Sequence, residues 1–365
     1  MQVNIKDLIE IYDKEIRVNC RNKNKLYIFE RNKMQNINNI YNELISDNYY
    51  PGKYNIFIIK DPKYRIIMSL SIKDKIVNHY IAKNILINKL DKYLDTRIIA
   101  TRKNYGIDYG IKLIKKYIEK NKNYGNFFIL KIDIKKYFYN IDHNVLKELL
   151  KDKLNENEYK LLFRIIDSTN DDYINREIDK KKKLLIENGI DKNKVNDLPY
   201  YKYDKGLSLG AMVSQFLSIY YTHKLIFYIV HKLKLVESVI YMDDIIIIHK
   251  DKNYLKECLS KIEYYLNNYL KLEVNKKKTK KVSIKDGFTF LGYRFFINNN
   301  KTIIKIKNDT LKIIKRRVKE LNYLYNNNYI KFNKVFCILN TYLYSFKYTS
   351  NFKVVKIVNK YFRVN

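Results

Sequence analysis

The sequence predicts a mixed α+β fold with two or three subdomains, and three observations indicate this class. Short β-branched runs at residues 53–60, 127–134 and 239–248 are typical of strands. Stretches with apolar residues three and four positions apart, at 1–50, 72–95 and 301–365, predict helices. With 365 residues, of which 46% are hydrophobic, the chain can bury a large core.

The charge of the chain favours a polyanionic partner. There are 72 Lys and Arg against 38 Asp and Glu, which gives a formal net charge of +34. A positive field of this size attracts nucleic acid. Lys, Asn, Ile and Tyr are also over-used throughout, as an A+T-rich genome imposes, so codon bias explains part of the excess. The remainder still favours nucleic acid as the partner.

Cysteine usage and hydropathy exclude several other classes. Cys20, Cys258 and Cys337 lie far apart and form no Cys-x-x-Cys pair, so neither a disulfide framework nor a zinc site is expected. The first ten residues lack the apolar core of a signal peptide. Since no apolar run approaches the length of a membrane span, we expect a cytoplasmic protein without a membrane partner.

Residues 1–50 are expected to form helices that end at the turn signal of residues 50–52. Residues 53–60 then predict a strand, followed by a tight turn at Asp61 and Pro62 and a second strand. Lys63 and Arg65 would lie on one face of that strand, where an ammonium and a guanidinium could hold a triphosphate. The alternative is a solvated edge strand whose charges prevent aggregation.

Residues 72–95 predict one packed helix. The loop at 101–110 is basic, aromatic and contains glycine, which suits contact with a nucleic-acid backbone through Arg102 and Lys103. An ordinary surface loop has the same composition.

Residues 127–134 predict a buried strand that ends in a carboxylate, Asp133, before a helix that continues through 140–147. An acid at the end of a buried strand is costly unless a cation meets it there. Phe138 would lie over this site, where its ring could press on the sugar of a nucleotide and exclude a 2′-hydroxyl; core packing is the compatible alternative.

The charged stretch 151–205 is interpreted as an insertion of solvated helices and loops. Residues 205–215 follow as a loop whose glycines, Gly206 and Gly210, permit close approach of the backbone to a ligand. Ser214 and Gln215 offer polar groups to a base or sugar, and an apolar helix comes after them.

Residues 239–248 predict a hairpin with Asp243 and Asp244 at its tip. Two adjacent carboxylates repel each other unless a cation neutralises them, and a divalent metal is the simplest partner. Asp133 would supply the third acid.

In residues 301–365, Leu311, Ile314, Val318, Leu321 and Tyr325 predict one face of a helix. Its basic stripe, Lys312, Lys315, Arg316 and Lys319, could contact duplex phosphates without reading sequence, or could be a solvated face. Two further helices, at about 331–348 and 352–363, would complete a small bundle.

The ordered motifs resemble those of reverse transcriptases over nearly the whole chain. The series comprises Lys63-Tyr-Arg65, Arg102-Lys-Asn-Tyr-Gly106, Asp133-Ile-Lys-Lys-Tyr-Phe138, Leu209-Gly-Ala-Met-Val-Ser-Gln215, Tyr241-Met-Asp-Asp244, 272–279 and Phe290-Leu-Gly-Tyr293. The resemblance implies a right-hand polymerase: fingers with the first palm elements at 1–125, an antiparallel-sheet palm at 126–300, and a helical thumb at 301–365.

The resemblance also implies roles for individual residues. Asp133, Asp243 and Asp244, with Ile134 beside them, match the metal site for two Mg²⁺ ions, with Mn²⁺ as an alternative. Two ions about 3.5–4 Å apart would activate the primer 3′-hydroxyl and neutralise pyrophosphate. The remaining matches are nucleotide contacts (Lys63, Arg65, Phe138, Leu209, Gly210, Gln215 and Lys278) and primer contacts (Tyr241, Met242, Leu291, Gly292 and Tyr293). The implied partners are an RNA template, a DNA or RNA primer and dNTPs.

The motif at Leu209 departs from the family's common Gln-Gly-x-x-x-Ser-Pro pattern. The Leu209-Gly210-x-x-x-Ser214-Gln215 version is similar to reverse transcriptases of diversity-generating retroelements and to related antiviral defence enzymes. The former implies error-prone cDNA synthesis and a small basic accessory protein. An antiphage enzyme with unusual priming and a non-catalytic nucleic-acid-binding protein are the alternatives.

Overall fold

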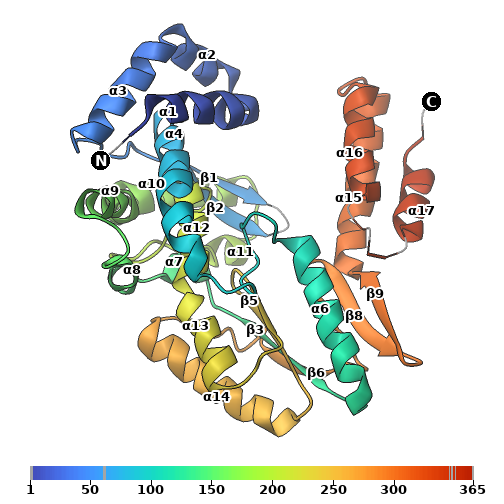
Figure 1. Cartoon of the computed structure of the whole chain (residues 1–365). Coiled ribbons are helices and arrows are strands. Elements are labelled where there is room, and N and C mark those ends of the chain that lie inside the picture. The colour runs from blue at the N-terminus through green and yellow to red at the C-terminus, as the bar shows by residue number, and fades with distance from the viewer. Residues whose placement is uncertain (1–2, 61–62, 345, 347, 350, 364–365) are drawn as a thin grey trace. The chain divides into compact units, whose positions relative to one another are not determined.

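The computed structural model of the chain describes residues 3–60, 63–344, 346, 348–349 and 351–363 (Figure 1). Helices combine with antiparallel sheets, which confirms the α+β prediction. The chain divides into two compact units. The first comprises Met1–Arg102, Ile132–Ile245 and Glu257–Thr279, and the second comprises Lys103–Lys131, Ile246–Lys256 and Lys280–Asn365. The predicted boundaries at residues 125 and 300 stay a prediction.

The N-terminal part of the first unit is helical, as expected. Asn4 begins the first helix, because its side chain accepts a hydrogen bond from the Lys6 amide and so satisfies a free helix-end donor. Buried apolar residues at helical spacing, such as Ile37, Ile40 and Leu44, pack the bundle. The elements are α1 (Ile5–Ile11), π-helical η1 (Tyr12–Arg17), α2 (Lys23–Arg31) and α3 (Lys33–Ile45).

The two strands predicted near residue 60 form an antiparallel pair, β1 (Asn55–Lys60) and β2 (Tyr64–Ser69), in which Lys60 faces Tyr64. The predicted turn at Asp61 and Pro62 lies outside the described residues. One face of the pair is apolar, and its side chains pack against Ile174 and Ile178 of α10 (Asp172–Glu187).

That packing overturns the interpretation of residues 151–205 as a solvated insertion. The segment forms α9 (Glu156–Asp167), η5 (Ser168–Asn170), α10 and α11 (Lys192–Asn196). Buried apolar residues of α9 and α10 belong to the core of the first unit, although charged residues separate them in the sequence. The segment therefore packs against the apolar face of the β1–β2 pair.

Residues 72–93 are continuously helical, which confirms that prediction, and Ser71 caps the start through the Asp74 amide. The run comprises α4 (Ile72–Tyr80), η2 (Ile81–Ile87), α5 (Asn88–Leu90) and η3 (Asp91–Tyr93). The prediction of one continuous helix through residues 140–147 is wrong. The segment breaks into α7 (Tyr137–Asn140) and α8 (His143–Leu150), because the Asp142 side chain caps a new helix at the amides of Asn144 and Val145.

Four strands form a sheet in the order β4 (Ser238–Tyr241), β5 (Asp244–His249), β3 (Phe128–Asp133) and β6 (Lys280–Ser283). The division into two units falls within β3 and β5. The predicted strand at 127–134 and the hairpin at 239–248 are both confirmed. Helices that follow in the chain are α12 (Met212–Tyr221), α13 (His223–Phe227), η6 (Tyr228–Lys232) and α14 (Lys252–Tyr269).

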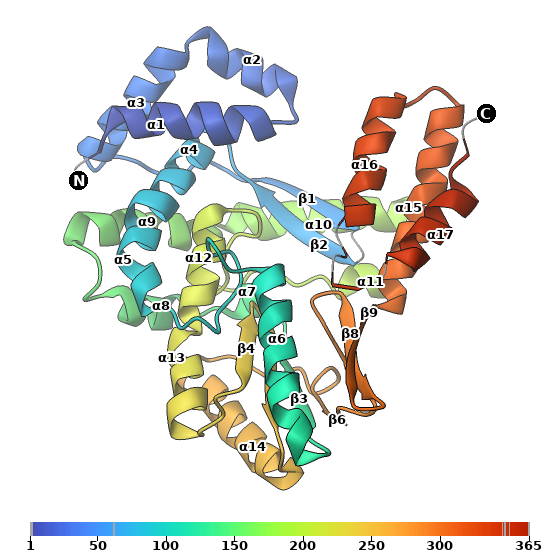
Figure 2. The ribbon, with the colours of Figure 1, turned by 45° about the vertical axis from the view of Figure 1, so that its right-hand side comes forward.

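The second unit contains a three-stranded antiparallel sheet and its own helical core (Figure 2). Ile314, Val318 and Leu321 of α15 are buried with Val335, Leu339 and Val354, so the predicted apolar face is confirmed. The elements are α6 (Ile107–Asn121), η4 (Lys122–Tyr124), β7 (Phe288–Phe290), β8 (Tyr293–Asn298), β9 (Lys301–Ile306), α15 (Asn308–Asn326), α16 (Phe332–Tyr344) and α17 (Phe352–Tyr361).

Within the described part of the chain, no helix has the length and apolar character needed to cross a membrane.

Candidate active site

The tip of the β4–β5 hairpin is a tight turn whose conformation places Asp243 next to a buried strand. Met242 has a φ of 56°, in the left-handed region that tight turns use. The Ser218 hydroxyl of α12 lies 3.4 Å from the Met242 sulfur. The Ile134 amide donates to the Asp243 carbonyl at 3.1 Å, so the tip is joined to the end of β3.

Asp133 ends β3 in a polar cage. Its side chain is buried, and the Lys278 ammonium donates to both carboxylate oxygens, at 2.9 and 2.7 Å. The Asn275 side-chain amide donates to Oδ1 at 2.8 Å, and the Thr279 hydroxyl accepts from the Asp133 amide at 3.4 Å. The cost of burying this acid is therefore offset by a cation and a neutral donor.

Asp243 carries the strongest electrostatic signal of the site. Burial, followed by the negative charges of Asp244 and Asp133, raises the pKa of Asp243 from 3.8 to about 6, while the charge of Lys278 acts in the opposite direction. The protein thus holds this acid where its ionised form is disfavoured. A bound cation would relieve that cost.

The donor set fits a hard divalent cation, because it consists of carboxylate oxygens in a partly buried, negatively charged position. The three acids do not form a set of three ligand atoms mutually within 4.8 Å; among the described residues, His143, Asp167 and Asp204 do so. Asp243 lines the adjoining cavity, whereas Asp244 is not among its lining residues. The two neighbouring acids are therefore placed differently.

The cavity beside Asp243 has a volume of about 1990 Å³ and lies wholly within the first unit. Four acids and eleven basic residues line it, so the net charge of its lining is strongly positive. Such a cavity suits a polyphosphate that brings its own metal ions. The basic lining residues are Lys60, Lys63, Arg65, Lys135, Lys136, Lys194, Lys205, Lys271, Lys276, Lys277 and Lys278.

The structure brings every residue predicted to contact the nucleotide into this cavity. Arg65 reaches it from β2, and Lys63 from the residue just before this strand. Phe138 reaches it from α7. Leu209, Gly210, Gln215 and Lys278 complete the set. Gly210 has a φ of 112°, which favours glycine, and an added Cβ would lie 3.6 Å from Ile67. Tyr241 and Met242, predicted to contact the primer, also line the cavity.

Other predicted contacts lie in the second unit. Leu291 and Gly292 form the turn between β7 and β8, with φ values of 50° and 83°. Tyr293 follows them and is buried, with its ring against Phe346 and Tyr348. On α15, the basic stripe of Lys312, Lys315, Arg316 and Lys319 is exposed, and Lys103 is exposed before α6.

The prediction that Arg102 belongs to a nucleic-acid track is wrong, because its side chain is buried. Its side chain is only 5% exposed and pairs with Asp91 at 2.8 Å. Its guanidinium also donates to the carbonyls of Asp95 and Ile98, at 2.8 and 3.0 Å. Arg102 therefore closes the end of the helical run at 72–93, a structural role that its loop composition did not reveal.

Sequence reasoning missed several residues of the site. Asn275 lies in the 272–279 motif, and its side-chain amide donates to Asp133. A polar amide next to three lysines could have indicated this contact. Lys194, Asp197, Leu198 and Pro199 also line the cavity. They come from the stretch interpreted as an insertion, and nothing in their local sequence indicates a site.

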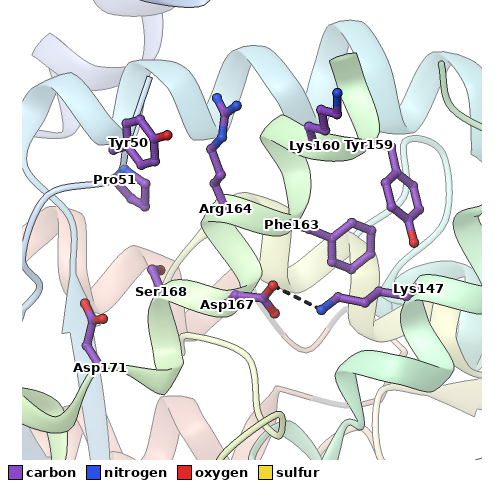
Figure 3. A pocket seen from close by; sticks show the side chains of 10 residues that line it. All are labelled: Tyr50, Pro51, Lys147, Tyr159, Lys160, Phe163, Arg164, Asp167, Ser168 and Asp171. Carbon is purple, nitrogen blue, oxygen red and sulfur yellow. Dashed lines mark hydrogen bonds and ion pairs between the residues drawn. The ribbon is translucent and has the colours of Figure 1, made fainter. Parts of the chain in front are cut away.

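A second cavity, of about 710 Å³, lies over α9 (Figure 3). Aromatic and basic side chains line it, including Tyr159, Phe163 and Arg164. Its basic groups are paired with acids: Lys147 with Asp167, and Arg164 with Asp47 outside the lining. The charge of this cavity is therefore largely neutralised within the protein.

The family model "Reverse transcriptase (RNA-dependent DNA polymerase)" matches residues 58–295, more than half of the chain. No curated protein matches. Apo telomerase of Candida tropicalis, truncated from its C-terminal domain, is similar with 16% identity and a TM-score of 0.49, over 70% of this chain and 55% of that one.

Two telomerase complexes with a TWJ fragment of telomeric RNA are also similar. The Candida tropicalis complex has 17% identity and a TM-score of 0.47, over 85% of this chain and 52% of that one. The Candida albicans complex has 14% identity and a TM-score of 0.47, over 75% and 51%. The chain spans about half the length of the telomerase chains that it matches.

Proposed function

The chain belongs to the reverse transcriptase (RNA-dependent DNA polymerase) family, and we propose that it extends a DNA or RNA primer with dNTPs on an RNA template. The observation that carries this proposal is the cavity in which Asp243, a carboxyl with a raised pKa, faces eleven basic residues. An acid that requires a cation, surrounded by groups that bind phosphate, suits nucleotidyl transfer.

Asp133 and Asp243 are the side chains that would hold the divalent ions, Mg²⁺ or Mn²⁺, with Ile134 beside them and Asp244 as a direct ligand or an orienting neighbour. The bound ions would supply Lewis-acid activation of the primer 3′-hydroxyl and charge neutralisation at the phosphates. The Lys278 ammonium pairs with Asp133 at 2.7 Å. Lys278 is 49% exposed, so its side chain can also serve a departing pyrophosphate.

The other residues of the cavity bind and orient the substrate. Arg65 and Lys63 would grip the triphosphate, because guanidinium binds phosphate oxygens bidentately and ammonium adds a point charge. Phe138 is half-buried at the cavity wall, where its ring would press on the sugar and exclude a 2′-hydroxyl. Tyr241 and Met242 are placed to contact the primer end.

Nucleic acid would also be held by the second unit. The exposed stripe on α15, with Lys103, suits phosphate contacts that do not read sequence. Leu291, Gly292 and Tyr293 would contact the primer through the β7–β8 turn.

The more specific role that we propose is error-prone cDNA synthesis in a diversity-generating retroelement, with a small basic accessory protein. Leu209 supports it, since it lines the cavity where the common family pattern has Gln. An aliphatic side chain there offers no hydrogen bond to a nucleotide, which weakens discrimination between bases. Antiphage defence with unusual priming shares the same motif and is the second candidate.

Primer extension tests the general proposal. The wild-type chain should extend a labelled primer on an RNA template with Mg²⁺, and Asp243→Asn should not. If both extend equally little, the chain is a nucleic-acid-binding protein on a polymerase fold. Sequencing cDNA made in cells then separates the specific roles: substitutions at template adenines support diversification, and homopolymer or phage-dependent products support defence.

A further inference from the structure

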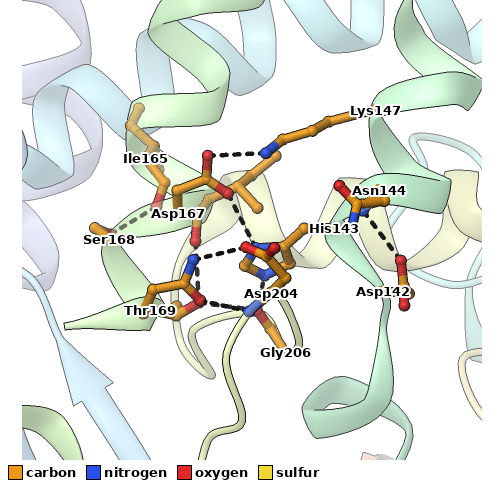
Figure 4. Close-up of polar contacts among 12 residues, drawn as sticks. Asp142, His143, Asn144, Lys147, Ile165, Asp167, Ser168, Thr169, Asp204 and Gly206 are labelled. Carbon is orange, nitrogen blue, oxygen red and sulfur yellow. Dashed lines mark hydrogen bonds and ion pairs between the residues drawn. The ribbon is translucent and has the colours of Figure 1, made fainter. Parts of the chain in front are cut away.

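His143, the first residue of α8, lies at the centre of a buried polar cluster (Figure 4). Its side chain is 0% exposed. Nε2 lies 2.8 Å from the Gly206 carbonyl oxygen, and Nδ1 lies 3.0 Å from Oδ1 of Asp167. A carbonyl and a carboxylate both accept hydrogen bonds, so each ring nitrogen donates when both bonds are made. The ring therefore joins α9 to the loop that contains Gly206.

The Gly206 carbonyl receives a second donor. The Thr169 hydroxyl lies 3.1 Å from it and 3.0 Å from the Ile166 carbonyl, so the two carbonyls share its one proton, and the Gly206 amide donates to the Ile141 carbonyl at 2.8 Å. Gly206 has a φ of 94°, and an added Cβ would lie only 2.9 Å from the Tyr201 ring. Gly206 is thus held by hydrogen bonds at both its carbonyl and its amide, and it has no room for a side chain.

The loop that Gly206 begins lines the cavity beside Asp243 and is hydrogen-bonded to Phe138, another of its lining residues. The Leu207 amide donates to the Phe138 carbonyl at 2.8 Å, and the Leu209 carbonyl accepts from the Met68 amide of β2 at 3.1 Å. Phe138, Leu209 and Gly210 line the cavity. A displacement of Gly206 would therefore move both the ring proposed to contact the sugar and the loop beside the base.

The acid that orients His143 is itself fixed. Lys147 donates to Oδ2 of Asp167 at 3.1 Å. Burial alone would raise the pKa of the Asp167 carboxyl, but the hydrogen bonds from His143 and Lys147 outweigh it and lower this pKa. Asp167 thus remains an acceptor for Nδ1–H and keeps Nε2–H directed at Gly206.

We propose that His143 is a positioning residue for the incoming deoxynucleotide. It touches no substrate, and it acts through the Gly206 carbonyl, which sets the positions of Phe138, Leu209 and Gly210 around the sugar and base. This inference rests on the proposed polymerase function. The Nε2–H donor is the operative group, so a side chain that keeps this donor should keep nucleotide affinity.

The test uses two substitutions that each preserve one half of the imidazole. In His143→Gln the amide nitrogen has the reach of Nε2, whereas in His143→Asn it has the reach of Nδ1. The purified full chain extends oligo(dT) on poly(rA) with varied dTTP, and KM, kcat and the preference for dTTP over the ribonucleotide UTP are measured. His143→Asn should raise KM about three- to tenfold and lower the preference, with kcat within about twofold, while His143→Gln stays near wild type.

Equal losses in both variants, or a change in kcat and melting temperature alone, would overturn the assignment. If His143→Asn does not fold, Thr169→Val decides, with Thr169→Ser as its control. Val removes the second donor to the same carbonyl, so KM should rise, and an unchanged KM overturns the inference. A wild-type chain that makes no RNA-templated product refutes the proposed function itself, whereas active wild type with unaffected variants refutes only the role of His143.

Discussion

Replacing Asp243 by Asn should stabilise the metal-free protein at alkaline pH while removing its activity. Burial and the charges of Asp244 and Asp133 raise the pKa of Asp243 from 3.8 to about 6. A carboxyl group with a raised pKa favours the folded state when protonated. Its contribution is therefore complete below pH 3.8 and is lost as the pH rises through about 6. Asn has no charge to bury and avoids this loss.

The size of the effect follows from the two pKa values. Asp243→Asn should unfold with a free energy higher than wild type by about 1 kcal/mol at pH 4.5 and by at most about 3 kcal/mol at pH 8. Urea unfolding in EDTA at both pH values measures it. Asp152→Asn, at an exposed turn, is the matched control and should differ from wild type by less than about 0.5 kcal/mol at either pH.

Adding Mg²⁺ provides a second arm of the same experiment. At pH 8 the ion should stabilise wild type more than Asp243→Asn, because binding to the folded state stabilises it by mass action. A variant that is less stable than wild type at pH 8, or a difference that does not change between the two pH values, would refute the electrostatic account of this site.

Three further substitutions test separate parts of the site. Phe138→Ala should lower discrimination against ribonucleotides by about 10- to 100-fold in single-nucleotide extension, and unchanged sugar selectivity would remove its gate role. Leu209→Gln should shift the misincorporation spectrum seen by sequencing the products, and an identical spectrum would end the fidelity argument. Neutralising Lys312, Arg316 and Lys319 together should weaken duplex binding and reduce its dependence on log salt by about 0.9 per lost phosphate contact. An unchanged salt slope would make the stripe a merely solvated face.

The acids of the site could be predicted because their local sequence is itself unusual. Asp133 follows a strand of apolar residues, and Asp243 lies between two β-branched strands. Carboxylates at such positions require a compensating charge wherever the strands pack. The hairpin and the strand were predicted for the same reason, since alternating and continuous apolar runs specify strands over a few residues.

Burial that depends on distant partners could not be predicted in this way. Arg102 lies in a loop whose composition suits a surface, yet its guanidinium pairs with Asp91 and donates to the carbonyls of Asp95 and Ile98, in the loop after the helical run at 72–93. The charged stretch 151–205 hides Ile174 and Ile178, four residues apart, which pack on the β1–β2 pair. In both cases the burial depends on tertiary contacts with distant residues, which local composition does not predict.

Residues of 151–205 that line the cavity beside Asp243 could not be predicted from local sequence either. Lys194 and Leu198 line the cavity, although their surroundings resemble any solvated segment. The role of Gly206 could not be predicted either, because glycine is common in loops, and the contacts that fix this one, among them the Tyr201 ring and the His143 imidazole, come from distant residues.

A double-mutant cycle on primer extension tests most directly whether Asp133 and Asp243 serve one reaction. Wild type, Asp133→Asn, Asp243→Asn and the double variant are compared on an RNA template with saturating Mg²⁺ and dNTP. We predict that each single variant loses on the order of a thousandfold in rate, and that the double variant is no slower than the slower single one, because residues that act as a unit are not additive. A single variant that keeps near wild-type rate, or losses that multiply in the double variant, would contradict a shared catalytic centre.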